Sequence, residues 1–140
     1  MEKLKEFRAL GLTEKTLKAL KEKGFEKPSP IQALTIPALL TGDKDIIGQA
    51  QTGTGKTAAF SLPILEKIEK VTGNIQAIVL APTRELAVQV AEEMSSLSHG
   101  RGLKITPIYG GQSLEFQRKQ LRRGTAVSYT HLTLPTTPYV

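Results

Sequence analysis

Cysteine is absent from this chain of 140 residues, which excludes disulfide bonds and is typical of a protein that works in the cytosol. No apolar run approaches the roughly 20 residues that a membrane-spanning helix needs. The opening stretch, MEKLKEFRAL, alternates charged and apolar side chains and lacks the apolar centre of a secretory signal. These absences together predict a soluble, cytoplasmic protein.

The charge is unbalanced toward the basic side. The chain has 19 Lys and Arg against 13 Asp and Glu, which gives a formal net charge of +6 and a pI near 9.7. Such a balance favours a polyanionic partner such as nucleic acid, although many basic proteins bind none. The length is that of one domain with a single core.

Two helices are expected before the first glycine-rich stretch. The first helix is expected within residues 12–25, with Thr13 as its capping residue and apolar side chains on one face. A second helix is expected to start after Ser29 and to close at Gly42. Because proline lacks an N–H group, Pro37 should bend or interrupt it.

Three short runs rich in β-forming residues follow, each trailed by a loop and a helix-patterned segment. They are DIIGQA at 45–50, QAIVLAP at 76–82 and KITPIYG at 104–110. Strands that alternate with helices join through right-handed crossovers into a parallel sheet with helices on both faces. The sequence therefore predicts an α/β fold, whose ligands bind where the strands end and the helices begin.

The first strand end leads into AQTGTGKT, which fits the phosphate-loop pattern with alanine in place of the leading glycine. Gly53 and Gly55 let the backbone wrap closely around an anion. Lys56 can reach the β- and γ-phosphates of a nucleotide, and the Thr57 hydroxyl can ligate Mg²⁺. The alternative is a glycine-rich turn with a solvated lysine. The predicted nucleotide-binding loop comprises Ala50, Gln51, Thr52, Gly53, Thr54, Gly55, Lys56 and Thr57.

The second strand end, APTRELAVQV, places Thr83 as the cap of a helix that runs to about Leu97. A capped helix in which Glu85 complements the helix dipole is the simpler interpretation. The basic side chain of Arg84 at a helix start beside the phosphate loop indicates, alternatively, a seat for a second phosphate.

The third strand end carries Gly110 and Gly111, which allow close approach to the backbone, before Ser113 caps another helix. Two i,i+4 pairs make one flank of that helix basic: Arg118 with Arg122, and Lys119 with Arg123. Such a run is usually a solvated face. Three anion-suited strand ends at one edge of a sheet nevertheless favour contact with a nucleic-acid backbone.

These motifs resemble, in their order, those of the DEAD-box family of ATP-dependent RNA helicases. GFEKPSPIQ is similar to the family's Q motif, AQTGTGKT to its motif I, PTRELAVQ to its motif Ia and YGG to its GG element. The resemblance runs from about Phe7 to Thr125. It implies an incomplete RecA-like phosphate-loop domain, the first part of the first lobe, with a mainly parallel sheet flanked by helices.

The resemblance also implies a role for each motif residue. Gln32 would read the adenine edge, Phe25 would pack on the base, and Phe7 would support this pocket. Local pattern alone makes Gln32 a helix-surface residue and both phenylalanines core. Lys56 and Thr57 would take part in catalysis, with Thr57 on the Mg²⁺ ion. The sugar-phosphate backbone of RNA would be contacted, without base reading, by Pro82, Thr83, Arg84, Gly110 and Gly111.

Only part of the family's machinery is found in this sequence. In that family ATP binds between two RecA-like lobes, which close over single-stranded RNA and reopen after hydrolysis. The DEAD tetrapeptide, the SAT motif and a second lobe with arginine fingers are absent from these 140 residues. Because hydrolysis needs carboxylates on Mg²⁺ and cations at the γ-phosphate, the chain alone is expected to be inactive. It is also expected to be a monomer.

The resemblance stops abruptly after Thr125. Where the family continues with a strand and a TPGR-like motif, this sequence reads AVSYTHLTLPTTPYV, which resembles a translated sequencing adapter. We therefore expect a helicase-like part at 1–125 and an unstructured tail at 126–140, of which 126–129 can pair at a sheet edge. A genuine Thr/Pro-rich linker or a divergent strand is the alternative.

Two other functions are compatible with the motifs. One is a different phosphate-loop NTPase of the same superfamily, such as a DNA-directed helicase, although Gln32 and PTRELA argue against it. The other is a protein that docks RNA through its basic flank and whose loop binds no nucleotide.

Overall fold

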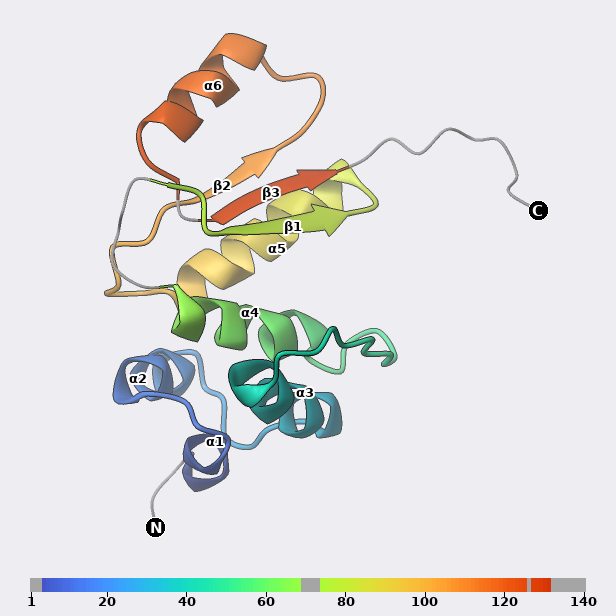
Figure 1. Ribbon diagram of the computed structural model, residues 1–140, viewed down its shortest axis with the longest axis vertical. Helices are drawn as coiled ribbons and strands as arrows, with labels where there is room; N and C mark the ends of the chain where they lie inside the picture. The colour runs from blue at the N-terminus through green and yellow to red at the C-terminus, as the bar shows by residue number, and fades with distance from the viewer. Residues whose placement is uncertain (1–3, 69–73, 126, 132–140) are drawn as a thin grey trace, which may run out of the picture.

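The computed structural model describes residues 4–68, 74–125 and 127–131, arranged as helices around a small sheet (Figure 1). The helices are α1 (Lys5–Ala9), α2 (Glu14–Glu22), α3 (Pro30–Thr41), α4 (Lys56–Lys67), α5 (Arg84–Leu97) and α6 (Leu114–Arg122). The strands are β1 (Ala77–Ala81), β2 (Ile105–Ile108) and β3 (Val127–His131). Within these ranges no helix combines the length and the apolar character needed to cross a bilayer.

The three strands form one parallel sheet in the order β1-β3-β2. Tyr129 of β3 pairs with Val79 of β1 on one side and with Pro107 of β2 on the other. Helix α5 connects β1 to β2, and α6 connects β2 to β3. The predicted strands at 76–82 and 104–110 are confirmed, and so is the parallel arrangement that alternating strands and helices favour.

The two faces of the sheet are covered unequally. Val79 and Ile105 pack toward the main core, on the side covered by α5. On the opposite face α6 lies beside β2, where buried Thr106 and Thr125 share a hydrogen bond of 3.0 Å. Ile78 is 64% exposed on that same face, so the prediction of helices on both faces holds only at the β2 end.

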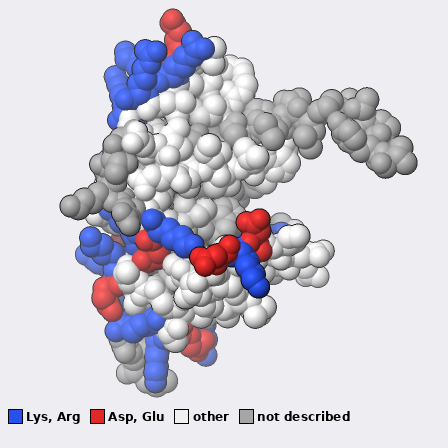
Figure 2. Space-filling view, in the orientation of Figure 1, with Lys and Arg blue, Asp and Glu red and all other residues white. Residues whose placement is uncertain are grey.

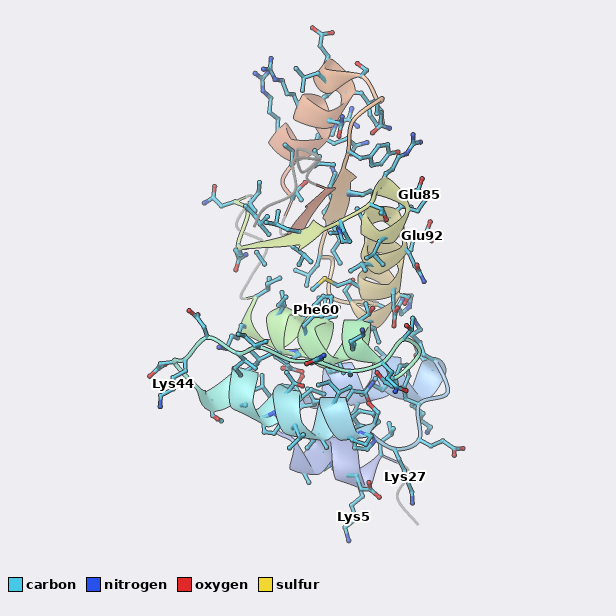
Figure 3. The ribbon with its side chains drawn as sticks, turned by 90° about the vertical axis from the view of Figure 1, so that its right-hand side faces the viewer. Lys5, Lys27, Lys44, Phe60, Glu85 and Glu92 are labelled. Carbon is cyan, nitrogen blue, oxygen red and sulfur yellow. The ribbon has the colours of Figure 1, made fainter. Side chains whose placement is uncertain are left out.

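The core lies mainly between helices. Helix α4 packs against both α3 and α5, and Figure 3 shows Phe60 on the side of α4 that faces the sheet. Burial of large aliphatic side chains contributes most of the stability of such a cluster, at about 1.5 to 3 kcal/mol for each side chain. Its buried members are Leu4, Phe7, Leu12, Leu17, Leu20, Ile36, Ala58, Leu62, Leu65, Val90, Ala91, Met94 and Leu97.

Helix α3 starts and ends where the sequence predicted, but it has no break at Pro37. Ser29 is the residue before the helix, Pro30 is its first residue and Gly42 its C-cap. The helix continues through Pro37 without interruption. The hydroxyl of Thr41 donates to the Pro37 carbonyl at 2.8 Å in the last turn.

Arg101, in the turn after α5, ties α2 to α4. Its guanidinium lies 3.2 Å from a carboxylate oxygen of Glu66 and donates to the Leu65 carbonyl and the Thr16 hydroxyl. Thr13 also donates to Glu66, from its N–H at 3.1 Å and its hydroxyl at 2.9 Å. Thr13 thus precedes α2 as predicted, but its hydroxyl bonds to α4 instead of capping its own helix.

The predicted strand at 45–50 is wrong. These residues form neither helix nor strand, and every residue from 43 to 49 is exposed, including Lys44, which projects from this segment in Figure 3. Ile47 is fully exposed at 100%. A strand needs a hydrogen-bonded neighbour, and the strands of the described sheet pair only with one another.

The prediction of an unstructured tail also needs correction. Val127–His131 form β3, which pairs on both sides and is therefore the central strand, whereas the sequence predicted at most an edge pairing over 126–129. Alternating β-forming residues after a glycine suffice for a strand when two neighbours of the same direction are already in place. Residues 126 and 132–140 lie outside the described ranges, and the division at residue 125 stays a prediction.

Candidate nucleotide and RNA site

The phosphate loop enters α4 through two glycines in the left-handed backbone region. Gly53 has a φ angle of 79° and Gly55 one of 80°, which side chains rarely allow. Gly55 is the N-cap of α4, so the helix begins at Lys56. The first N–H groups of a helix lack partners within it and carry partial positive charge, so this helix start favours an anion.

The predicted ligands of the nucleotide phosphates lie at this helix start. Lys56 is exposed and Thr57 is half-buried behind it. The Thr54 hydroxyl donates to the Gln51 carbonyl at 2.6 Å, which closes the turn, while Thr52 is exposed. The loop therefore places two left-handed glycines directly before α4, whereas the strand expected before it is missing, and phosphate binding by this loop stays a prediction.

Gln32, on α3, holds the loop from the side. It is 3% exposed, its Nε2 donates to the Gly55 carbonyl at 3.1 Å, and its Oε1 accepts from the Ser29 N–H at 2.9 Å. A Cβ atom on Gly55 would lie 2.3 Å from Gln32 Nε2. Both ends of the amide contact backbone in this structure, and reading of an adenine edge by Gln32 stays a prediction.

Ser29 brings a second polar group to the same place. Its side chain faces the backbone N–H of Gln32 in a capping-box arrangement at the start of α3, and its hydroxyl oxygen lies 3.6 Å from the Cβ position of Gly55. The sequence predicted Ser29 only as a helix cap. The predicted capping role of Ser29 therefore accounts for its side chain.

Phe7 and Phe25 lie in contact, as a joint aromatic support would require. Their ring centroids are 6.1 Å apart at an angle of 75°, the edge-to-face arrangement that aromatic pairs prefer. Phe7 is completely buried, and Phe25 is partly buried against the core. Packing of Phe25 on a base stays a prediction.

The second strand end has the predicted cap. The Thr83 hydroxyl accepts from the Leu86 N–H at 3.2 Å, and α5 begins at Arg84. Pro82, Thr83 and Arg84 are all exposed. Figure 3 shows Glu85 near the start of α5 and Glu92 farther along it, and both side chains are exposed. The corner is thus a capped helix start that leaves its basic residue accessible.

The third strand end lies against the second. The Arg84 guanidinium stacks over the ring of Tyr109, with its carbon 4.6 Å from the ring centroid. A Cβ on Gly111, where φ is 86°, would lie 3.9 Å from Arg84 Nη1. Gly110 and Gly111 are exposed, and the Ser113 hydroxyl accepts from the Phe116 N–H at 3.4 Å. The predicted RNA-contacting residues therefore form one corner.

The predicted site residues fall into two groups. Phe25, Gln32 and the loop form the nucleotide group, and residues 82–84 with Gly110 and Gly111 form the RNA group. Within the described part of the chain, no hydrogen bond, ion pair or ring contact joins a member of one group to a member of the other.

The basic flank predicted on α6 is exposed. Figure 2 shows Lys and Arg side chains gathered over this helix. None of its cations pairs with a carboxylate of the residues that the structure describes. The four exposed cations are Arg118, Lys119, Arg122 and Arg123.

The described residues offer little to a metal ion beyond Thr57. They hold no group of three His, Asp or Glu side chains that could surround a cation. A Mg²⁺ ion at Thr57 would therefore take most of its oxygen ligands from the nucleotide phosphates and water, as Mg²⁺ commonly does. The hydroxyl at the helix start fits that arrangement.

Sequence reasoning missed two residues of the RNA corner. In the sequence Tyr109 stands out only as part of YGG, and the local pattern assigns no role to Gln117. Gln117 is 6% exposed, accepts from the Tyr109 N–H at 2.9 Å and donates to the Tyr109 carbonyl at 3.0 Å. A glutamine among charged residues on an amphipathic helix carries no local signal that it is buried.

This geometry defines a class of α/β protein. Such a protein has a phosphate loop at one helix start and a basic corner where two strands end. The DEAD/DEAH box helicase family matches residues 29–137, and the chain belongs to that family. The resemblance found in the motifs is thereby confirmed.

Relatives from bacteria carry the same family name. The chain is 51% identical over 117 residues to the DEAD-box ATP-dependent RNA helicase CshA of Geobacillus kaustophilus, a match that covers 84% of this chain and 25% of the relative. Identity to the Bacillus subtilis (strain 168) protein of that name is 52%, with 84% and 24% covered. The chain therefore spans about a quarter of the length of these relatives.

Solved structures agree with this assignment. A DEAD box protein from the hyperthermophile Methanococcus jannaschii matches with a TM-score of 0.83 and 45% identity, over 89% of this chain and 34% of that one. The RNA helicase Prp28 from Chaetomium thermophilum bound to ADP matches with a TM-score of 0.80 and 35% identity, over 94% and 33%.

Proposed function

We propose that this chain is the ATP-binding and RNA-contacting first part of an ATP-dependent RNA helicase, within its first RecA-like lobe. The observation that carries the proposal is the pair of left-handed glycines directly before α4, whose first residue is Lys56. The names of the bacterial relatives and the ADP bound to the similar Prp28 support it.

The nucleotide is proposed to lie with its phosphates at the start of α4. The first-turn N–H groups and Lys56 would hold the phosphates, and the Thr57 hydroxyl would ligate the accompanying Mg²⁺. Gln32 and Phe25 would contact the adenine. For Gln32 this requires exchange of a backbone partner, Ser29 or Gly55, for the base. A bound nucleotide would thereby be coupled to the position of α3.

RNA is proposed to contact the exposed corner made by Pro82, Thr83, Arg84, Gly110 and Gly111 through its phosphates and sugars. Backbone contact does not read bases, so binding should not depend on sequence. Hydrolysis and strand separation would need acidic and basic groups that these 140 residues do not supply, and are therefore proposed for the whole helicase only.

Two titrations on the unmodified chain test this proposal. A fluorescent ADP analogue is displaced by ADP and by GDP, and labelled single-stranded oligouridine, oligoadenosine and matching DNA are bound at rising salt. We expect ADP to displace better than GDP, and both RNAs to bind alike with affinity that falls as salt rises.

The alternatives give different results. Equal displacement by ADP and GDP, or none by either, would contradict the proposal of an adenine-specific site. Tighter binding of DNA than RNA would favour a DNA-directed helicase. RNA binding without nucleotide binding would favour an RNA-docking protein whose loop holds no nucleotide.

A further inference from the structure

The guanidinium of Arg84 occupies a defined place in the free protein. It stacks on the Tyr109 ring at 4.6 Å and lies close to Gly111, where a Cβ atom would meet its Nη1 at an ordinary contact distance of 3.9 Å. No carboxylate of the described residues pairs with it. Its hydrogen-bond donors therefore remain available to an anion, while its plane is set by the ring.

The backbone of Tyr109, from which the ring projects, is held by a buried amide. Gln117 of α6 accepts from the Tyr109 N–H and donates to the Tyr109 carbonyl, at 2.9 and 3.0 Å. The same Nε2 lies 3.3 Å from the Gln112 carbonyl on the far side of the two glycines. One side chain thus fixes the end of β2 and the turn that follows it.

We infer that Tyr109 and Gln117 are positioning residues for the contact between Arg84 and an RNA phosphate. This inference rests on the proposed function. An exposed arginine samples many rotamers, and ordering it on binding costs free energy. Stacking on the ring of Tyr109, whose backbone Gln117 holds in place, restricts those rotamers before RNA arrives, so the guanidinium fork meets the phosphate already oriented.

Tyr109→Leu tests the ring and Tyr109→Phe is its conservative counterpart. Affinity for labelled oligouridine should fall about two- to fivefold in Tyr109→Leu and stay unchanged in Tyr109→Phe, because phenylalanine keeps the stacking face. Phe116→Leu removes a nearby, 49% exposed aromatic that has no arginine over it, and should bind RNA like the parent.

Two further measurements separate positioning from general damage. Tyr109→Leu in an Arg84→Ala background should cause no additional loss of RNA affinity, because the ring then has nothing to orient. In NMR spectra the δ-protons of Arg84 should be shifted upfield by the ring in the parent and in Tyr109→Phe, but not in Tyr109→Leu. Gln117→Leu should reduce that shift if the chain stays folded.

The outcomes distinguish this inference from the function beneath it. If Arg84→Ala weakens RNA binding while Tyr109→Leu does not, or if the two losses add in full, the positioning role is wrong and the RNA contact stands. If the parent and Arg84→Ala bind RNA equally, the proposed RNA contact and the positioning role both fail.

Discussion

Gly55 lies where two distant segments of the chain meet, and its missing side chain allows them to meet. Gln32 Nε2 approaches so closely that any Cβ on Gly55 would overlap it, at 2.3 Å. Gly53, two residues earlier, has nearly the same φ angle but nothing within 4 Å of its Cβ position. Both positions therefore need glycine for its left-handed backbone, but only Gly55 also needs it because a neighbouring side chain lies too close for a Cβ atom.

Gly55→Ala should destabilise the chain more than Gly53→Ala, as measured by urea unfolding. Both substitutions force a side chain into the left-handed region, at about 1 to 2 kcal/mol, and only Gly55→Ala also displaces Gln32. In a Gln32→Ala background the excess cost should vanish. Equal losses at both glycines in the parent background would show that the contact with Gln32 contributes nothing.

Motif spacing predicted residue types better than it predicted contacts. The phosphate loop, the caps at Thr83 and Ser113 and the exposed Arg84 were all readable from local sequence. The contact of Arg84 with Tyr109 was not, because it joins segments 25 residues apart through the packing of α5 against the sheet. The pattern of one segment does not show which residue, far away in the sequence, its side chains will contact.

At the scale of elements, β3 connects the other two strands. Neither β1 nor β2 pairs with the other, so the sheet exists only through β3. Pro107, which cannot donate to a ladder, lies in β2, and proline is tolerated at such an edge. A central strand has no such tolerance, since each of its N–H groups faces a neighbour.

Ser128→Pro should therefore lower the free energy of unfolding by about 1 to 3 kcal/mol, because proline removes the ladder N–H group of a strand that pairs on both sides. Ser128→Ala keeps the N–H group and should change stability little. Urea unfolding of both variants measures the difference. Unchanged stability in Ser128→Pro would mean that residues 127–131 do not complete the sheet in solution.

The elements that sequence predicted correctly are those with local determinants. Helix α5 starts at its cap and ends at Leu97, as expected, and β1 and β2 match their apolar runs. The segment at 45–50 has an equally good strand pattern but no neighbour among the described strands, so it forms no strand, and residues 45–49 are exposed. Strand formation depends on partners that the pattern of one segment cannot report.

At the scale of the whole molecule, the surface carries both a cluster of cations and several exposed apolar side chains. The cations of α6 cover one end, in Figure 2, while Ile47, Ile78 and Leu80 expose apolar side chains at 100%, 64% and 58%. Ile78 and Leu80 alternate along β1, so they expose the same face of that strand.

The central claim is that the start of α4 binds the phosphates of an adenine nucleotide, and one titration tests it most directly. ADP affinity is measured by calorimetry for the parent, for Lys56→Ala and for Lys67→Ala, which removes the same charge from the far end of the same helix. Loss of a charge-assisted contact at Lys56 should weaken binding by about 1.5 to 3 kcal/mol, roughly ten- to hundredfold. Lys67→Ala should bind like the parent, whereas ADP bound by Lys56→Ala as tightly as by the parent would contradict the account.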